Sequence, residues 1–394
     1  MIKAIHHRQK LVLLIIVTAQ FFCTSLWFAG NAILPDLQST FSLPIRALGD
    51  LTSAVQFGFI TGTLLFATLT IADRYSPSRV FFVCSVLGSL VNLLIIYADG
   101  LVSLIVLRAL TGFCLAGIYP VGMKISSDYF EQGLGRALGF LVGALVLGTA
   151  LPHFISVFTY SLDWHYVIYV TSALAAVGGF LIFILIPDGP FRKKGSRIDL
   201  RISFRLFKES NFRKAAFGYF GHMWELYTLW AFIPLIVSHY NSLHPMQYLD
   251  VSLWSAVVIG SGGIACILGG FVAEKIGSSK TAFIALSVSG LCCLCSIFLF
   301  ASGELMFLAF LLIWGMAVVA DSPQFSTLVA RYAPKESTGS ALTIVNSIGF
   351  AITIISLQTM SLVLNYINFE LAFVGLAIGP LFGLLSMRKS VATP

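Results

Sequence analysis

Residues 112–120 read Gly112-Phe-Cys-Leu-Ala-Gly-Ile-Tyr-Pro120, and residues 315–323 read Gly315-Met-Ala-Val-Val-Ala-Asp-Ser-Pro323. Both stretches are apolar, and their glycines and prolines recur at the same spacing. Three residue pairs share an offset of 203, namely Gly112/Gly315, Pro120/Pro323 and Tyr129/Tyr332. Weak self-similarity at one fixed offset is typical of proteins built from internal structural repeats. The sequence therefore predicts two related halves.

The amino-acid composition excludes a soluble globular protein. Of the 394 residues, 58% are hydrophobic and 10% are charged, whereas soluble globular chains have roughly 25% charged residues. A disordered chain, a disulfide-stapled secreted domain and a typical cytosolic enzyme are all excluded on this ground. The seven cysteines lie in apolar stretches and lack the spaced partners of a metal site, so we expect no metal, disulfide or cofactor.

The apolar residues fall into twelve runs, and a helix needs about 20 such residues to cross the hydrocarbon core of a bilayer. The runs cover residues 11–34, 50–72, 80–97, 101–125, 137–158, 165–187, 215–238, 251–272, 281–301, 304–330, 339–363 and 370–386. The predicted fold is an all-α polytopic membrane protein with twelve transmembrane helices in two pseudo-symmetric six-helix halves. The first run is too long for a signal peptide and no cleavage site follows it, so we expect it to remain as a span.

The positions of the 24 Lys and Arg residues predict the orientation. With a cytoplasmic N-terminus, the cytoplasmic segments hold 22 of them and the opposite loops hold one, Arg46. The positive-inside rule then places both termini in the cytoplasm, and we expect a bacterial inner (plasma) membrane. Nine of these residues lie in segment 188–214, a basic linker between halves at 1–187 and 215–394. We expect the linker to touch anionic lipid head groups, so nucleic acid is not needed as a partner.

A short charged motif recurs after the second and eighth runs, as Ala72-Asp73-Arg74 and Ala273-Glu274-Lys275. With twelve spans and a six-plus-six repeat, the chain resembles the major facilitator superfamily over essentially its whole length. That family's loop signature, Gly-x-Leu-Ala-Asp-Arg-x-Gly, keeps its frame in the second half as Gly270-Phe-Val-Ala-Glu274-Lys275-Ile-Gly277. The first half has Leu69 and Ser76 where glycines are expected. Span 4 matches the family's Arg-x-x-x-Gly pattern as Arg108…Gly112.

The resemblance implies a cytoplasmic latch that is closed in one state and broken in another. Carboxylates at helix ends can cap neighbouring helix N-termini, and basic residues can pair with acids at other helix ends. We expect Arg74 and Lys275 to pair with acids such as Asp128 and Glu336. The predicted gate residues are Asp73, Arg74, Asp128, Glu274, Lys275 and Glu336.

Three ionisable residues lie far from the ends of their spans: Arg108, Glu225 and Asp321. Each costs roughly 2.5–3.5 kcal/mol at the bilayer centre, so contact with lipid is implausible. In the superfamily fold, spans 1, 4, 7 and 10 line a central cavity, and all three charges fall on that set. We expect Arg108 to bind an anionic group of the solute, and Glu225 or Asp321 to hold a coupling proton. His222, one turn from Glu225, is expected to share the proton of Glu225, and a plain hydrogen-bonded histidine is the alternative. A static buried ion pair of Arg108 with an acid is the alternative.

Helical phase adds further residues to the predicted solute site. Successive residues of a helix are rotated by about 100°, so residues three, four or seven apart share a face. In each of spans 1, 4, 7 and 10 one face is polar and carries aromatic rings. Together with Arg108, the predicted solute-binding residues on these faces are Gln20, Thr24, Trp27, Asn31, Thr111, Tyr119, Tyr219, Trp314 and Gln324.

With these charges, the resemblance implies a proton-coupled secondary active transporter that moves a small organic, anionic or amphiphilic solute by alternating access. Proton-driven export of a drug, metabolite or siderophore is the alternative within transport. A non-transporting sensor is the alternative of another class, although the longest loop is too short for an added soluble domain. No catalytic cluster is visible, so we expect no enzyme activity, and we expect the protein to be monomeric.

Overall fold

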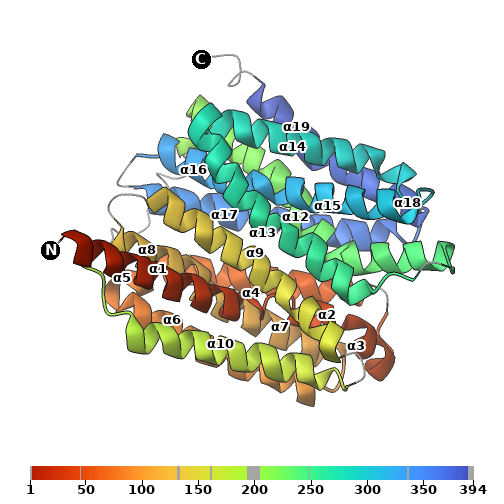
Figure 1. The fold of residues 1–394 in the computed structure, drawn as a ribbon, viewed down its shortest axis with the longest axis horizontal. Helices are drawn as coiled ribbons and strands as arrows, with labels where there is room; N and C mark the ends of the chain where they lie inside the picture. Colours follow the sequence, from red (N-terminus) through yellow and green to blue (C-terminus); the bar gives the residue numbers. More distant parts are fainter. Residues whose placement is uncertain are drawn as a thin grey trace. The chain divides into compact units, whose positions relative to one another are not determined.

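The computed structural model describes residues 2–44, 46–130, 134–159, 162–192, 205–246, 248–334 and 337–388. Throughout these ranges the chain forms helices, turns and loops, and contains no strand (Figure 1). Ten of the described helices are long and apolar enough to cross a membrane. The prediction of an all-α, multi-pass membrane protein is therefore confirmed.

The chain folds into two compact units. Unit 1 contains residues 1–43 and 54–198, and unit 2 contains residues 44–53 and 199–394. Residues 193–204 of the predicted basic linker lie outside the described residues. The predicted boundaries of the two halves and of the linker remain predictions.

Unit 1 begins with a long helix followed by several short ones, and α10 packs along α1 and α6 (Figure 1). The helices along this part of the chain are α1 (Ile2–Thr24), α2 (Ala29–Ala32), α3 (Leu34–Phe41), α4 (Ala47–Thr68), α5 (Ile71–Arg74), α6 (Pro77–Leu93) with its 3₁₀ extension η1 (Leu94–Tyr97), α7 (Leu101–Ala116), α8 (Tyr119–Tyr129), α9 (Leu134–Thr159) and α10 (His165–Leu185).

Unit 2 is organised around its longest helix, α12, which packs against α17 and α19. Its helices are α12 (Ser210–Leu243), α13 (Val251–Ile276), α14 (Ser278–Cys295) followed by η2 (Ser296–Phe298), α15 (Glu304–Ala320), α16 (Ser322–Tyr332), α17 (Thr338–Val363), α18 (Phe369–Ala372), η4 (Phe373–Ala377) and α19 (Ile378–Met387).

Two predicted spans, the first and the seventh, are not among the ten apolar helices. Helix α1 runs from Ile2 to Thr24, and its apolar part among the described side chains is Gln9–Thr24. Helix α12 is long enough, but polar residues such as His222 and Glu225 lower its hydropathy. The count of twelve spans and the cytoplasmic position of the termini remain predictions.

The repeat seen in the sequence reappears as a pair of matching helix breaks. Helix α8 (Tyr119–Tyr129) and helix α16 (Ser322–Tyr332) begin and end at positions that differ by the repeat offset, and a proline lies in the first turn of each. Proline has no N–H and clashes with the carbonyl four residues earlier, which interrupts the helix. In unit 2 that carbonyl belongs to Val319, and the Cys266 thiol donates to it at 3.4 Å. Pro120 and Pro323 therefore bend spans 4 and 10 at equivalent points.

Within unit 1, α4 and α7 approach each other backbone to backbone. A Cβ atom placed on Gly58 would collide with the carbonyl oxygen of Ala109, and one placed on Gly112 would collide with that of Val55. Small residues permit this closeness between membrane helices, where packing and not hydrophobicity drives association. The two glycines therefore fix the distance and the relative depth of α4 and α7.

We expect Gly58→Val to destabilise the protein, because overpacking of a well-packed contact typically costs about 1–3 kcal/mol. The matched control is Gly139→Val in α9, where a Cβ would meet nothing within 4 Å. Thermal unfolding of both variants in detergent measures the difference. Equal melting temperatures for the two variants would contradict close packing at Gly58.

Candidate functional site

The first span of unit 1 is interrupted in its second half. Between α1 and α2, residues 25–28 form tight turns in which the Leu26 and Trp27 N–H groups bond to carbonyls three residues earlier, at 3.3 and 3.0 Å. Such short-range bonds replace the regular helical ladder and leave later carbonyls in need of donors. Arg108 of α7 supplies them, because Nη1 donates to the Leu26 carbonyl at 3.0 Å and Nη2 donates to the Trp27 carbonyl.

These contacts define the environment of Arg108. The side chain is 1% exposed, and backbone carbonyls, not carboxylates, accept its two Nη bonds. The alternative of a static ion pair therefore gains no support from the contacts of Arg108. Its Nε atom has no hydrogen-bond partner among the described residues. Next to this atom lies Gly30, where a Cβ would stand 3.1 Å away. The Nε–H of the guanidinium is thus available to a ligand.

The other solute-binding residues predicted in unit 1 differ in their surroundings and hydrogen bonds. Trp27 belongs to the break itself, and its ring lies 4.9 Å from that of Phe59. The hydroxyls of Thr24 and Thr111 donate to carbonyls of their own helices, at 2.8 Å each. Gln20 is fully buried, yet neither atom of its amide has a hydrogen-bond partner in the described part of the chain. Two further predicted residues are Asn31, which is buried in α2, and Tyr119, which is half-buried at the start of α8.

In unit 2, Glu225 is completely buried and collects three donors on one carboxylate oxygen. Trp314 Nε1 donates to Oε1 at 2.6 Å, Ser289 Oγ at 2.5 Å and Cys293 Sγ at 3.2 Å. The donors come from α15 and α14, so this carboxylate ties three helices together. Its second oxygen, Oε2, has no hydrogen-bond partner among the described residues. Trp314 was predicted from helical phase, whereas Ser289 and Cys293 were not.

The second buried acid of unit 2 pairs with a histidine. His222 Nδ1 of α12 lies 2.8 Å from Asp321 Oδ1, and both side chains are 0% exposed. Asp321 occupies the break between α15 and α16 that Pro323 produces. The sequence had grouped His222 with Glu225, one turn away on the same helix. The structure places it against Asp321 instead, because the Glu225 carboxylate turns towards α14 and α15.

The two remaining residues predicted in unit 2 flank this acid–histidine pair. The ring of Tyr219 lies 5.8 Å from the ring of His222. Gln324, in the first turn of α16, is 4% exposed and faces Gly269 of α13. Unit 2 therefore brings together two buried carboxylates, a histidine and a tryptophan donor from α12, α15 and the break between α15 and α16.

The amino-acid sequence can now be compared with the sequences of known proteins. The sequence profile of the Major Facilitator Superfamily matches residues 16–357. The chain belongs to this superfamily. Its members are transporters, and relatives named as transporters agree with this, so the protein is a transporter and not an enzyme.

Three relatives of this transporter have names that specify a solute. The "Probable sulfoacetate transporter SauU" of Cupriavidus necator is 22% identical over 70% of this chain and 66% of its own length. The 4-hydroxybenzoate transporter PcaK of Pseudomonas aeruginosa is 26% identical over 41% of this chain and 36% of its own length. The D-galactonate transporter of Escherichia coli is 23% identical over 52% of this chain and 53% of its own length. The matches to all three span less than two thirds of the relatives' lengths.

Among the predicted gate residues of the transporter, Asp73 and Asp128 share a lysine. Lys124 Nζ lies 2.9 Å from Asp128 Oδ1 and 3.5 Å from Asp73 Oδ1. Asp128 pairs here with Lys124, one turn away on the same helix, because i,i+4 neighbours meet directly, and its pairing with Arg74 remains a prediction. Arg192 adds a bond from Nη2 to the Asp73 carbonyl at 3.2 Å.

The predicted gate of the second half is only partly described. Glu274 and Lys275 lie at the exposed end of α13, and the described residues provide neither with an ion pair. The expected partner Glu336 lies outside the described residues.

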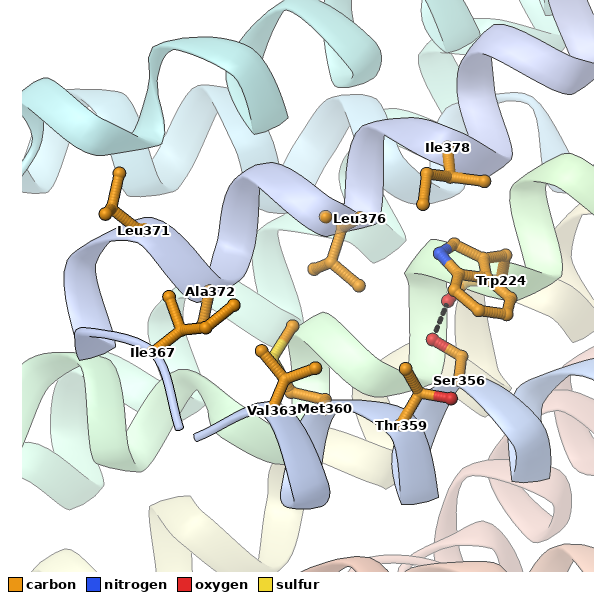
Figure 2. A pocket seen from close by; sticks show the side chains of 11 residues that line it. Trp224, Ser356, Thr359, Met360, Val363, Ile367, Leu371, Ala372, Leu376 and Ile378 are labelled. Carbon is orange, nitrogen blue, oxygen red and sulfur yellow. Dashed lines mark hydrogen bonds between the residues drawn. The ribbon is translucent and has the colours of Figure 1, made fainter. Parts of the chain in front are cut away.

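Unit 2 also contains an apolar pocket of about 550 Å³, which includes its open side. Figure 2 shows it between α12, α17 and the α18–α19 segment, with Trp224 at one end and Ile367 near the other. Ser356 Oγ donates to the Trp224 carbonyl at 2.6 Å and is therefore occupied. None of the predicted solute or proton residues lines this pocket, and its apolar wall does not suit a small charged solute.

Proposed function

We propose that the protein is a proton-coupled secondary transporter of a small organic anion and works by alternating access. The observation that supports this best is the pair of buried carboxylates in unit 2, one beside His222 and the other held by Trp314. Ionisable groups within membrane spans usually mark ion or substrate pathways, because each is costly to keep there. Family membership supplies the transport function, and these groups supply the proposed coupling.

The proposed coupling follows from the cost of burying charge. An ionised carboxylate with an unpartnered oxygen is costly in a dry site, and a bound proton removes that cost. Glu225 Oε2 and Asp321 Oδ2 both lack hydrogen-bond partners among the described residues. These oxygens can exchange protons only when water reaches them. When the site closes and water leaves, their negative charge must be neutralised by a bound proton. Proton binding and closure of the site are therefore physically linked.

The proposed solute class rests on two observations. Arg108 is a buried cation whose Nε donor is unused among the described residues, and a guanidinium binds carboxylates and related anions well. The named relatives point the same way, because sulfoacetate, 4-hydroxybenzoate and D-galactonate are all organic acids. We propose that an organic carboxylate or sulfonate approaches Arg108 beside the broken first span, with Gln20 and Trp27 nearby.

The remaining expectations belong to the same proposal. The Asp73–Lys124–Asp128 cluster is proposed as part of a gate at the cytoplasmic end of unit 1. The protein is proposed to act as a monomer in a bacterial inner membrane, with its basic linker at 188–214 near anionic lipid head groups.

Flux through purified protein in liposomes tests the proposed function. Vesicles with an imposed inward proton gradient are offered labelled sulfoacetate, 4-hydroxybenzoate or D-galactonate. We expect accumulation of at least one anion that disappears when a protonophore is added. Reversing the gradient tests the export alternative. Anion binding without flux would identify a sensor, and flux that ignores the protonophore would remove proton coupling.

A further inference from the structure

Helix α4 has a buried polar residue that is not among the predicted solute, proton or gate residues. Gln56 is 0% exposed, and both amide atoms, Oε1 and Nε2, lack a hydrogen-bond partner among the described residues. Its neighbour Phe57, about 100° further round the helix, is 59% exposed, as expected for a side chain facing lipid. The amide therefore points into the protein and still has its full hydrogen-bonding capacity.

Packing within unit 1 places Gln56 at the depth of Arg108. Gly58 of α4 abuts the carbonyl of Ala109, the residue that follows Arg108 on α7. One turn along α4 from Gln56, the Phe59 ring contacts Trp27, whose carbonyl accepts the Arg108 guanidinium. Gln56 and Arg108 thus belong to one layer of the unit, next to the break in the first span.

The energetics argue against a purely structural role. A buried polar group without a partner costs about 1–3 kcal/mol, and the contact with α7 is made by Gly58 on the opposite face of α4. A leucine or methionine of similar volume would avoid this cost. An amide that is kept in a membrane span without protein partners indicates contact with water or with a polar ligand.

We infer that Gln56 is a specificity-determining residue that hydrogen-bonds the polar part of the solute while Arg108 binds its charge. The amide presents a donor and an acceptor side by side, so it suits a hydroxyl or a second oxyanion more than an apolar substituent. This inference rests on the proposed function, because it assigns one residue of the same solute site.

Cysteine labelling tests the location of Gln56 without knowledge of the solute. Gln56→Cys is treated with a membrane-impermeant, sulfonate-bearing methanethiosulfonate reagent, applied in turn from each side of the membrane. The matched control is Phe57→Cys, and peptide mass spectrometry separates both positions from the native cysteines. We expect modification at position 56 from at least one side and none at 57. No modification at 56, or equal modification at both positions, would overturn the inference even if anion transport is demonstrated.

Selectivity tests the role of the amide. In Gln56→Leu we expect the uptake ratio of D-galactonate, which has several hydroxyls, to 4-hydroxybenzoate to change by about tenfold or more, because loss of a hydrogen-bonding group mainly affects solutes that used it. Thermal unfolding should be unchanged or raised, because the apolar side chain removes an unsatisfied amide. An equal loss of uptake for both anions, or a marked loss of stability, would assign Gln56 to the scaffold. Should neither anion be transported by the wild type, the labelling result alone decides the inference.

Discussion

Glu225→Gln is expected to eliminate proton-driven accumulation while leaving exchange of solute across the membrane. The amide occupies nearly the same volume and can still accept the bond from Trp314, so the fold should persist. It cannot bind and release a proton. A gradient of one pH unit stores about 1.4 kcal/mol per proton, enough for about tenfold accumulation of solute in the wild type. The variant should bring internal and external concentrations only to equality.

The matched control for this prediction is Glu304→Gln, at the exposed start of α15 in the same unit. It removes the same charge from a position outside the buried cluster, and accumulation should remain at the wild-type level. Counterflow in the absence of a proton gradient provides the second measurement, because it needs solute binding and alternation but no net proton movement. Undiminished accumulation in Glu225→Gln would show that this carboxylate does not couple transport, and Asp321 would be the next position to test.

Some parts of the fold were predictable because they depend on local chemistry. The prolines at 120 and 323 favour a helix break, and the structure shows both breaks at positions related by the repeat. The burial of Arg108, Glu225 and Asp321 followed from the cost of exposing a charge to lipid. These inferences require only the residue type and its depth in a span.

The partners of the buried charges were not predictable in the same way. Arg108 bonds to carbonyls in a helix break at residues 25–28, where no proline or glycine signals an interruption. Glu225 receives donors from residues 64 and 68 positions further along the chain, Ser289 and Cys293. Serines and cysteines are common in apolar helices, so only the side-chain bonds from α14 to Glu225 single out this pair.

One contact was available from the sequence and was not predicted. Lys124 and Asp128 are four residues apart on a predicted helix, which is the spacing at which opposite charges meet. The family resemblance had directed attention to Arg74 instead. A local pairing rule was the better guide here, because it depends only on helix geometry and not on how the helices of another protein are arranged.

Arg108→Lys is expected to lower both thermal stability and transport, although the positive charge is kept. The guanidinium reaches the Leu26 and Trp27 carbonyls with two separate nitrogens, in a fixed planar fork. An ammonium is a single point of charge on a flexible chain and cannot reproduce that geometry. Hydrogen bonds that involve a charged group contribute about 1.5–3 kcal/mol each, so the loss of one should be visible in the melting temperature.

Comparison with a second lysine substitution separates geometry from charge. Arg79→Lys, at an exposed position near the start of α6, makes the same chemical change outside the buried site and should have little effect. If Arg108 only attracted the solute, lysine would retain part of the affinity and the stability would not change. Loss of stability together with loss of transport would instead mean that the arginine also holds the broken first span against α7. Wild-type stability and uptake in Arg108→Lys would contradict both roles, because neither the fork nor its free Nε donor would then matter.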